Sequence, residues 1–471
     1  MKIASVATAL GVAVSQDEDP ISVYQRIRGH YFIQYFNSIQ GVYQSPSYAD
    51  TPLIQTTDIQ SKRRAEVYLR YDFDPAELES RFNKGHQAVD GVSPRTLFFS
   101  SGMSAITTLL LYLARAATSR RACIGLHSYF ETVRLLRQLF RLEAQEEAKL
   151  NIKGDAQILW MDYPLSTEWN EFPDLSSILK RFRTHAIRHY DRDFFAVIDY
   201  SVAAFAFDIR DHVSELPENV HLLLISSLQK HMGYGLDLAR GGAITIYSRS
   251  PELPISLARL RTYSGSCLTE TSFYLMPPVI PSLIKDLVKD AGMNARRLAE
   301  AVANLSVDGL RLHYPPQART PFETSLIFLE IDDRAARSPE SDTYPADSLL
   351  QYILSEARSC HAPVTHGESF GFAMTRIHKW GPFYSDVRSV RICAGYDEQL
   401  AEAAIEPILA GIISYANSIG GQRDLRNAIR DVTRLDISSQ YDGSPANYGS
   451  WLTRALSDTR GGEGPGDPTY G

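Results

Sequence analysis

A lysine stands at the end of an apolar segment, in the run Ser226-Ser227-Leu228-Gln229-Lys230. The segment before it, residues 220–225, is apolar enough to form a buried strand, and Gly233-Tyr234-Gly235 after it breaks any helix. An amine fixed at a strand end, with hydroxyls close by, suits a Schiff base with an aldehyde cofactor. A lysine on an exposed loop is the alternative, and this motif alone would favour it.

Two further positions could bind the polar ends of such a cofactor. Asp199 directly follows the apolar segment 194–198, at the end of a strand where parallel sheets bind their ligands. The turn Ser100-Ser101-Gly102-Met103-Ser104 ends another apolar segment and opens a helix, so its free backbone N–H groups could bind a phosphate. A helix cap and an ordinary strand-to-helix turn are the competing interpretations.

An arginine interrupts an apolar segment late in the chain, in Ser389-Val390-Arg391-Ile392-Cys393-Ala394-Gly395. A guanidinium inside a buried strand is costly unless it meets an anion, and its forked shape matches a carboxylate. Arg391 is therefore a candidate for binding a substrate carboxylate. A structural ion pair is the alternative.

Alternating strands and helices must position these residues. Apolar segments and segments with helical periodicity follow one another from residue 96 to residue 247. The expected strands are 97–99, 122–126, 158–161, 194–198, 220–225 and 241–247, and the expected helices are 103–117 and 129–142. Repeated units of this kind predict an α/β fold with a mostly parallel central sheet and helices on both faces.

A smaller α/β module follows a long helix predicted at 281–305. Its expected strands are 325–331 and 389–394, and its expected helices are 347–359 and 401–418. We therefore divide the chain into an N-terminal arm (1–62), a large domain (63–295), a small C-terminal domain (296–419) and a C-terminal extension or tail (420–471), whose end is rich in Gly and Pro.

The N-terminal arm has no clear periodicity apart from a short helix expected near residues 21–36. Residues 3–14 are apolar and follow Lys2, as in a signal peptide. We favour instead a helix that packs on a partner, because the rest of the chain lacks the signs of a secreted protein.

Composition narrows the possible classes of protein. The chain has 471 residues, with 48 Lys and Arg against 55 Asp and Glu, so its net charge of −7 does not favour binding to nucleic acid. The four cysteines form no CxxC pair, and we therefore expect no metal site, no disulfide scaffold and a reducing, cytoplasmic location. No apolar run is long enough to span a membrane.

These residues together resemble a known family, the Cys/Met-metabolism branch of fold-type I pyridoxal-phosphate (PLP) enzymes, which includes cystathionine γ-synthase, γ-lyase and β-lyase. Gly102-Met103 resembles the family's phosphate-binding turn, and Tyr129-Phe130-Glu131-Thr132 falls where the family has Tyr-Gly-Gly-Thr. Asp237 follows Lys230 by seven residues, as in the family's lysine loop. The resemblance covers residues 68–418 and implies PLP as the cofactor, with Tyr129 stacked on its ring and assisting catalysis.

The resemblance implies the other cofactor contacts in the same way. Asp199 corresponds to the carboxylate that keeps the pyridine nitrogen protonated, and Ser201 to a threonine that supports this contact. Ser227 and Lys230 match the family's Ser-x-x-Lys run, with the serine on the phosphate and the lysine as the Schiff-base and catalytic residue. Gln229 replaces the threonine before this lysine and removes one hydroxyl from the phosphate site.

Four positions are implied to bind the substrate or to reach a neighbouring subunit. Arg391 corresponds to the arginine that binds the substrate carboxylate, and Ser166 stands where the family has an asparagine that contacts cofactor and substrate. Tyr68 and Arg70 resemble a motif that reaches the cofactor phosphate of a neighbouring subunit. We therefore expect a homo-oligomer, a dimer or a dimer of dimers, with shared active sites.

The expected function is that of a lyase or transferase of specialised amino-acid metabolism. It would act on a Cγ-substituted amino acid by γ-elimination or γ-replacement through a vinylglycine-type intermediate. A β-eliminating C–S lyase is an alternative, because the same lysine and tyrosine serve both reactions. A PLP-fold binding or structural protein without turnover is the alternative from another class, motivated by the altered phosphate site. We expect neither nucleic acid nor membrane as a partner.

Overall fold

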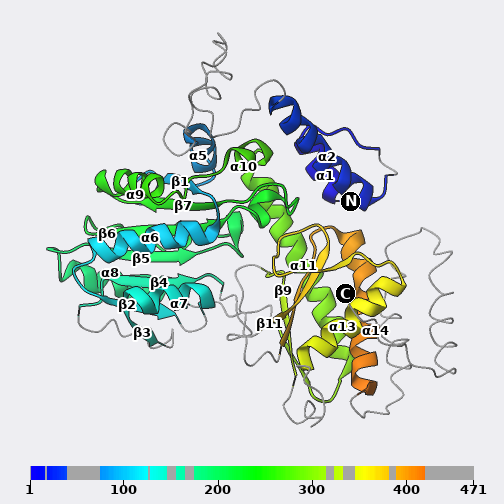
Figure 1. The fold of residues 1–471 in the computed structure, drawn as a ribbon. Coiled ribbons are helices and arrows are strands. Elements are labelled where there is room, and N and C mark those ends of the chain that lie inside the picture. Colours follow the sequence, from blue (N-terminus) through cyan, green and yellow to red (C-terminus); the bar gives the residue numbers. More distant parts are fainter. Residues whose placement is uncertain are drawn as a thin grey trace, which may run out of the picture. The chain divides into compact units, whose positions relative to one another are not determined.

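The chain forms a central sheet of seven strands in the order β1-β7-β6-β5-β4-β2-β3, as the computed structural model shows (Figure 1). The strands are β1 (Arg95–Phe99), β2 (Arg121–Gly125), β3 (Arg141–Gln145), β4 (Ile158–Asp162), β5 (Phe194–Asp199), β6 (Val220–Ser227) and β7 (Gly242–Tyr247). Only β7 runs antiparallel to its neighbours, β1 and β6. The predicted α/β fold with a mostly parallel sheet is confirmed.

The structure describes residues 2–15, 18–39, 75–125, 128–145, 155–164, 174–314, 323–331, 345–380 and 389–418. All of them belong to one unit, Met1–Arg423. The predicted C-terminal extension (420–471) and residues 40–74, which include part of the predicted arm, lie outside the described residues.

Adjacent side chains of the buried strands belong to two separate cores. On β4, Ile158 and Trp160 pack in one core, and Leu159 and Met161 pack in the other. Successive side chains of a strand point to opposite faces, so both faces of this sheet must be covered. One face is covered by α6 (Gly102–Ala116), α7 (Phe130–Leu139) and α9 (Glu252–Tyr263), and the other by α8 (Leu175–Ile187) and α11 (Pro281–Leu305).

A second sheet has five strands in the order β10-β11-β12-β9-β8, and only β10 and β11 pair in parallel. The strands are β8 (Leu310–His313), β9 (Leu326–Ile331), β10 (Val364–His366), β11 (Thr375–Trp380) and β12 (Ser389–Cys393). Two helices, α13 (Pro345–Ser359) and α14 (Glu398–Ser418), pack against each other and on this sheet (Figure 1). The predicted boundary between residues 295 and 296 falls within α11, and the division into domains stays a prediction.

Some elements differ from those expected from the sequence. The helix predicted at 129–142 is shorter, because α7 ends at Leu139 and β3 begins at Arg141, pairing in parallel with β2. Apolar residues in this segment suit a helix face and a buried strand equally, so periodicity alone does not separate the two. The strands β8, β10 and β11 were not predicted. The sequence of β11, Thr-Arg-Ile-His-Lys-Trp, contains no apolar run that would indicate a strand.

Two helices form the beginning of the chain, α1 (Lys2–Ala9) and α2 (Pro20–Ile39), and α2 is longer than the helix expected at 21–36. Ile3 and Val6 of α1 are fully buried within this chain. The Ile3 N–H donates to Asp397 Oδ2 at 3.1 Å, just before α14. The expectation that the first helix packs on a partner is therefore wrong, since its own chain covers its apolar face. A short helix, α10 (Glu270–Leu275), contacts α2.

The edge strand β1 is covered by the helix α5 (Ala76–Asn83). Glu79 of α5 accepts the N–H of Phe98 at 2.8 Å. Arg261 of α9 donates to the carbonyl of Phe98 at 2.9 Å and forms an ion pair with Glu79. The side chains of Arg261 and Glu79 are only 10% and 11% exposed, so a buried ion pair satisfies the open backbone groups of an edge strand.

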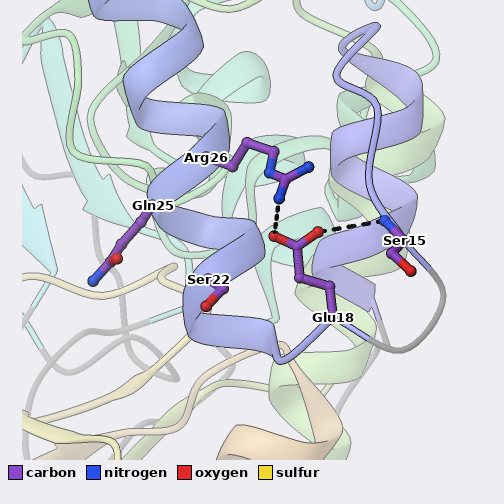
Figure 2. Close-up of a pocket in the computed structure, with 5 residues that line it drawn as sticks. All are labelled: Ser15, Glu18, Ser22, Gln25 and Arg26. Carbon is purple, nitrogen blue, oxygen red and sulfur yellow. Dashed lines mark hydrogen bonds and ion pairs between the residues drawn. The ribbon is translucent and has the colours of Figure 1, made fainter.

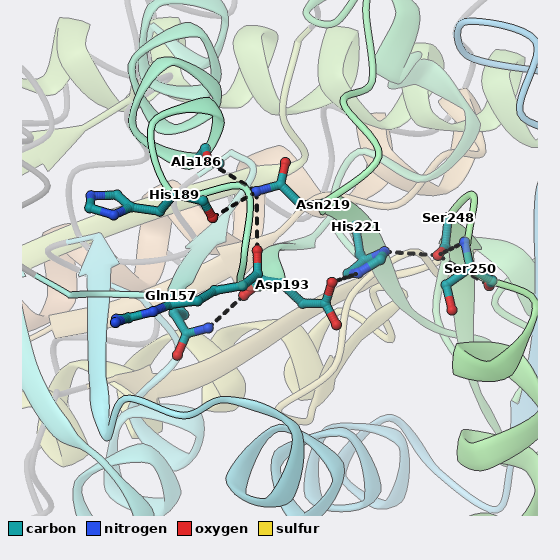
Figure 3. A network of polar contacts seen from close by, with 9 residues as sticks. Gln157, Ala186, His189, Asp193, Asn219, His221, Ser248 and Ser250 are labelled. Atoms are coloured by element: carbon teal, nitrogen blue, oxygen red, sulfur yellow. Dashed lines mark hydrogen bonds and ion pairs between the residues drawn. The ribbon is translucent and has the colours of Figure 1, made fainter.

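A polar network lies where the parallel strands begin (Figure 3). Asn219, just before β6, donates to three backbone carbonyls, those of Ala186, His189 and Arg192. His221 Nδ1 lies 2.8 Å from Ser248 Oγ, and its Nε2 lies 3.3 Å from Asp193 Oδ1. Because His221 is only 1% exposed and both of its ring nitrogens are engaged, this serine–histidine–aspartate group holds the loops together and offers no access to a substrate.

Candidate active site

A cavity of about 220 Å³ opens at the carboxyl ends of β4, β5 and β6. The last residues of these strands, Asp162, Asp199 and Ser227, line it. Parallel strands end at one edge of a sheet, so side chains that are far apart in sequence meet there. The other lining residues are Ser101, Gly102, Met103, Ile106, Tyr129, Pro164, Ser201, Val202, Ile225, Gln229, Lys230 and Phe370.

Most of the residues singled out from the sequence meet at this cavity. They are Gly102, Met103, Tyr129, Asp199, Ser201, Ser227, Gln229 and Lys230. Arg391 is not one of the lining residues, but its charge acts on both Lys230 and Tyr129. Tyr68, Arg70 and Ser166 lie outside the described residues, and their roles stay predictions.

The beginning of α6 forms one wall of the cavity. Ser101 precedes the helix with an extended backbone, and its hydroxyl accepts the N–H of Ser104 at 3.0 Å. The N–H groups of the first helical residues, Gly102 and Met103, have no acceptor within the helix and carry its positive dipole end. A Cβ on Gly102 would lie 3.5 Å from the Cβ of Ser227, an ordinary contact distance, so the start of α6 lies close to the end of β6.

A chain of hydrogen bonds connects the ends of β5 and β6. Asp199 Oδ1 accepts the N–H of Ser201 at 2.9 Å. Ser201 Oγ in turn accepts the N–H of Ser227 at 2.9 Å. These bonds fix the carboxylate of Asp199 relative to the hydroxyl-bearing end of β6. The resemblance implies that Ser201 supports the contact of Asp199 with the cofactor, and this role stays a prediction.

Lys230 lies three residues after the end of β6, and its Nζ is 4.0 Å from the centre of the Phe370 ring. Burial lowers the pKa of Lys230 to about 8, although the carboxylate of Asp199 opposes this effect. The guanidinium of Arg391 lowers the pKa further. A lysine with a pKa of about 8 is partly neutral at physiological pH. The neutral amine is the form that attacks an aldehyde.

Tyr129 immediately precedes α7, and its N–H donates to Asp162 Oδ2 at 2.8 Å. The carboxylate of Asp162 therefore fixes the backbone from which the phenol projects. Burial raises the pKa of Tyr129 well above its usual range, and the Glu131 carboxylate adds to this effect. The phenol stays protonated at neutral pH and can act as a proton donor.

Arg391 lies in the middle of β12 and is only 4% exposed. Its guanidinium carbon lies 4.2 Å from the centre of the Trp380 ring, and it donates to the carbonyl oxygen of Glu368. Its buried Nε has no hydrogen-bond partner, and no ion pair joins Arg391 to a carboxylate in the described part of the chain. The alternative of a structural ion pair is therefore not supported, and a buried cation of this kind favours an external anion.

Several lining residues were not singled out from the sequence, and two of them, Asp162 and Phe370, stand beside predicted site residues. Asp162 ends β4 as Asp199 ends β5, and the two aspartates are partners in the register of these strands. An acid directly after the apolar segment 158–161 is the same sequence signal that indicates Asp199. Phe370 comes from the loop between β10 and β11, and nothing in its local sequence indicates that it faces Lys230.

A larger open hollow of about 560 Å³ lies where α1 leads into α2, far from these residues in sequence (Figure 2). Its lining residues are Ser15, Glu18, Ser22, Gln25 and Arg26. Glu18 pairs with Arg26 at 2.8 Å and accepts the N–H of Ser15 at 3.3 Å. The two charged side chains of this hollow therefore already pair with each other.

The fold is similar to those of solved enzyme structures. A methionine gamma lyase from Micromonospora echinospora matches with a TM-score of 0.55 and 18% identity, covering 77% of this chain and 96% of its own. A cystathionine gamma-lyase from Lactobacillus plantarum gives 0.54 and 15%, covering 78% and 92%. A cystathionine gamma synthase from Xanthomonas oryzae gives 0.54 and 15%, covering 74% and 89%. This likeness shows the fold-type I PLP-dependent fold, as predicted. No family model and no curated protein matches the sequence.

The cavity fits pyridoxal phosphate. The N–H groups of Gly102 and Met103 and the hydroxyl of Ser227 line the cavity and can donate hydrogen bonds to a phosphate. Asp199 offers a carboxylate to a protonated ring nitrogen, and Lys230 offers a largely desolvated amine to an aldehyde. The described residues contain no cluster of metal ligands, and none of their helices is long and apolar enough to cross a membrane.

Proposed function

We propose that this protein is a PLP-dependent enzyme that acts on an amino acid with a leaving group at Cγ, by γ-elimination or γ-replacement. The observation that carries the proposal is the meeting of Lys230, Asp199 and the start of α6 at one cavity. The solved structures of similar fold, named as gamma lyases and a gamma synthase, support Cγ chemistry.

When bound, PLP supplies an aldehyde for amino groups and a ring that withdraws electrons from the substrate carbon. The first residues of α6 and Ser227 would hold its phosphate. The carboxylate of Asp199 would keep a proton on the ring nitrogen, and the Asp199–Ser201–Ser227 hydrogen bonds would keep that carboxylate in place.

The remaining residues would bind the substrate and move its protons. Arg391 would bind the substrate carboxylate, because its buried guanidinium has an unused donor. Lys230 would remove the proton from Cα, since its lowered pKa makes it a base near neutral pH. Tyr129 would donate a proton to the leaving group, because its phenol stays protonated.

Reduction with borohydride followed by peptide mapping tests the cofactor assignment. We expect a pyridoxyl group on Lys230 and none on Lys285, an exposed lysine of α11. A Lys230→Ala variant should carry no such group. If no adduct forms on Lys230 of the wild-type protein, the proposed function is wrong.

Product analysis with substrates bearing leaving groups at Cβ and at Cγ tests the reaction. We expect Cγ substrates to be consumed by the wild type, and at least 10³-fold more slowly by Lys230→Ala because the base is lost. Consumption of Cβ substrates alone would instead identify a β-eliminating C–S lyase. An adduct on Lys230 without turnover of either substrate would identify a binding protein.

A further inference from the structure

Gln229 occupies an unusual place beside the proposed phosphate site. It lies between Ser227 and Lys230 and lines the same cavity as the first residues of α6. The groups that would surround a phosphate here are neutral donors, the backbone N–H groups of Gly102 and Met103 and the Ser227 hydroxyl. A dianion at this end of the cavity needs every donor that the protein can direct at it.

The amide of Gln229 has a fixed orientation. Its Nε2 donates to Asp237 Oδ1 at 2.6 Å. A carboxylate can only accept hydrogen bonds, so the nitrogen rather than the oxygen of the amide must face Asp237. The amide nitrogen carries a second N–H that this bond leaves unused, directed away from Asp237 in the plane of the amide.

Asp237 is itself held by the second sheet. Its Oδ2 pairs with the guanidinium of Arg376 on β11 at 3.6 Å. Arg376 stacks on the ring of Phe372, with its guanidinium carbon 3.2 Å from the ring centre. A Cβ on Gly235 would lie only 2.2 Å from the Cα of Phe372. The loop between Lys230 and Asp237 therefore packs directly on the loop between β10 and β11.

The backbone conformation of Asp237 suits an aspartate. Its φ of 53° lies in the left-handed region, which aspartate and asparagine tolerate better than most residues. The side chain is 35% exposed, so its position depends on its bonds to Gln229 and Arg376 rather than on burial.

We propose that Asp237 is a positioning residue for the cofactor: it orients Gln229 so that the free amide N–H donates to the PLP phosphate. Gln229 thereby supplies a donor in place of the threonine hydroxyl that the family resemblance implies at this position. This inference rests on the proposed function and extends it to the phosphate end of the cofactor.

Comparing PLP with pyridoxal, which lacks the phosphate, tests the inference in the full-length protein freed of cofactor. The variants are Asp237→Gly, which suits the left-handed backbone and removes the acceptor of the Gln229 amide, and Gln229→Met, which keeps the length of the side chain. We expect the Kd for PLP to rise about tenfold in each, the usual effect of losing one hydrogen bond to a charged group. The Kd for pyridoxal should stay within about twofold, and the phosphorus NMR signal of bound PLP should shift.

The double variant and a matched control sharpen the test. If Asp237 acts through Gln229, the double variant should bind PLP no more weakly than Gln229→Met alone. Asp208→Asn serves as the control, because Asp208 is similarly exposed (40%) and bonds Arg210 but does not line the cavity. We expect this control to bind both ligands as the wild type does.

Each other outcome would overturn the inference. An equal loss of PLP and pyridoxal binding would show that Asp237 only supports the fold, and additive losses in the double variant would show that it does not act through Gln229. Unchanged PLP binding in both variants, with an intact borohydride adduct on Lys230, would reject this inference and leave the proposed function standing. A wild-type protein that binds neither ligand would reject both.

Discussion

At the scale of single residues, burial shifts the pKa values of the two side chains to which we assign proton transfer, Lys230 and Tyr129. Lys230 is an ordinary lysine in the sequence, but burial beside Arg391 brings its pKa down to about 8. Asp199 partly offsets this, so the amine is neither fully neutral nor fully charged near physiological pH. The pKa of Tyr129 is raised instead, because burial favours its neutral phenol.

Lys230 should make the stability of the cofactor-free protein depend on pH. Its pKa is about 8 when folded and near 10.5 when unfolded, so the unfolded chain binds more protons between these values. The free energy of unfolding should therefore rise with pH across this window, by about 3 to 4 kcal/mol, at about 1.4 kcal/mol per pKa unit. Urea unfolding of wild type and Lys230→Met at several pH values measures this.

The Lys230→Met variant should lack that rise and be the more stable protein below pH 8. The exposed Lys285→Met serves as the control and should follow the wild type. Parallel curves for wild type and Lys230→Met would mean that the burial of Lys230 does not lower its pKa.

At the scale of elements, the site depends on an edge strand that needs support. The strand β1 leads through Ser100 and Ser101 into the start of α6, so its position sets the end of the cavity where we propose that the phosphate binds. The buried pair of Glu79 and Arg261 satisfies the open backbone groups of Phe98 on this strand.

Glu79→Gln should therefore lower the free energy of unfolding by about 3 kcal/mol, because it leaves Arg261 as a buried cation without its partner. The matched control is Glu215→Gln. Glu215 pairs with Arg183 at 3.0 Å but is 76% exposed, and its loss should cost less than about 1 kcal/mol. Urea denaturation measures both, and equal effects would contradict a structural role for the buried pair.

At the scale of the whole molecule, the resemblance implies active sites shared between subunits. Tyr68 and Arg70 belong to the residues that would reach a neighbour, and they lie outside the described residues. If each site takes Lys230 from one subunit and Arg70 from the other, neither single variant can be active in a pure oligomer.

Mixing inactive Arg70→Ala subunits with inactive Lys230→Ala subunits should restore about a quarter of the wild-type activity, because half of the randomly formed dimers hold one intact site. Activity after joint refolding measures this, and each variant refolded alone is the control. No recovery in the mixture, with mixed oligomers present, would count against shared sites.

Much of the fold and of the site could be predicted from the order of residues along the chain. Three apolar segments each lead into a polar motif: Asp199, the pair Ser227 and Lys230, and the turn at Gly102. These are local patterns, which depend on periodicity and on the chemistry of neighbouring residues. The helix α11 begins and ends where its amphipathic pattern predicted. The end of α7 could not be predicted, because the pairing of β3 with β2 decides it.

The sequence by itself therefore determined the class of fold and most of the residues at the cavity. Only the tertiary structure revealed that Asp162 stands beside Asp199, that Phe370 faces Lys230, and that Arg391 is buried with an unused donor. Only it brought Asp237 to Gln229 and Arg376. These relations join segments that lie apart in the sequence, and they depend on the order of strands in two sheets and on how loops pack, which no local pattern encodes.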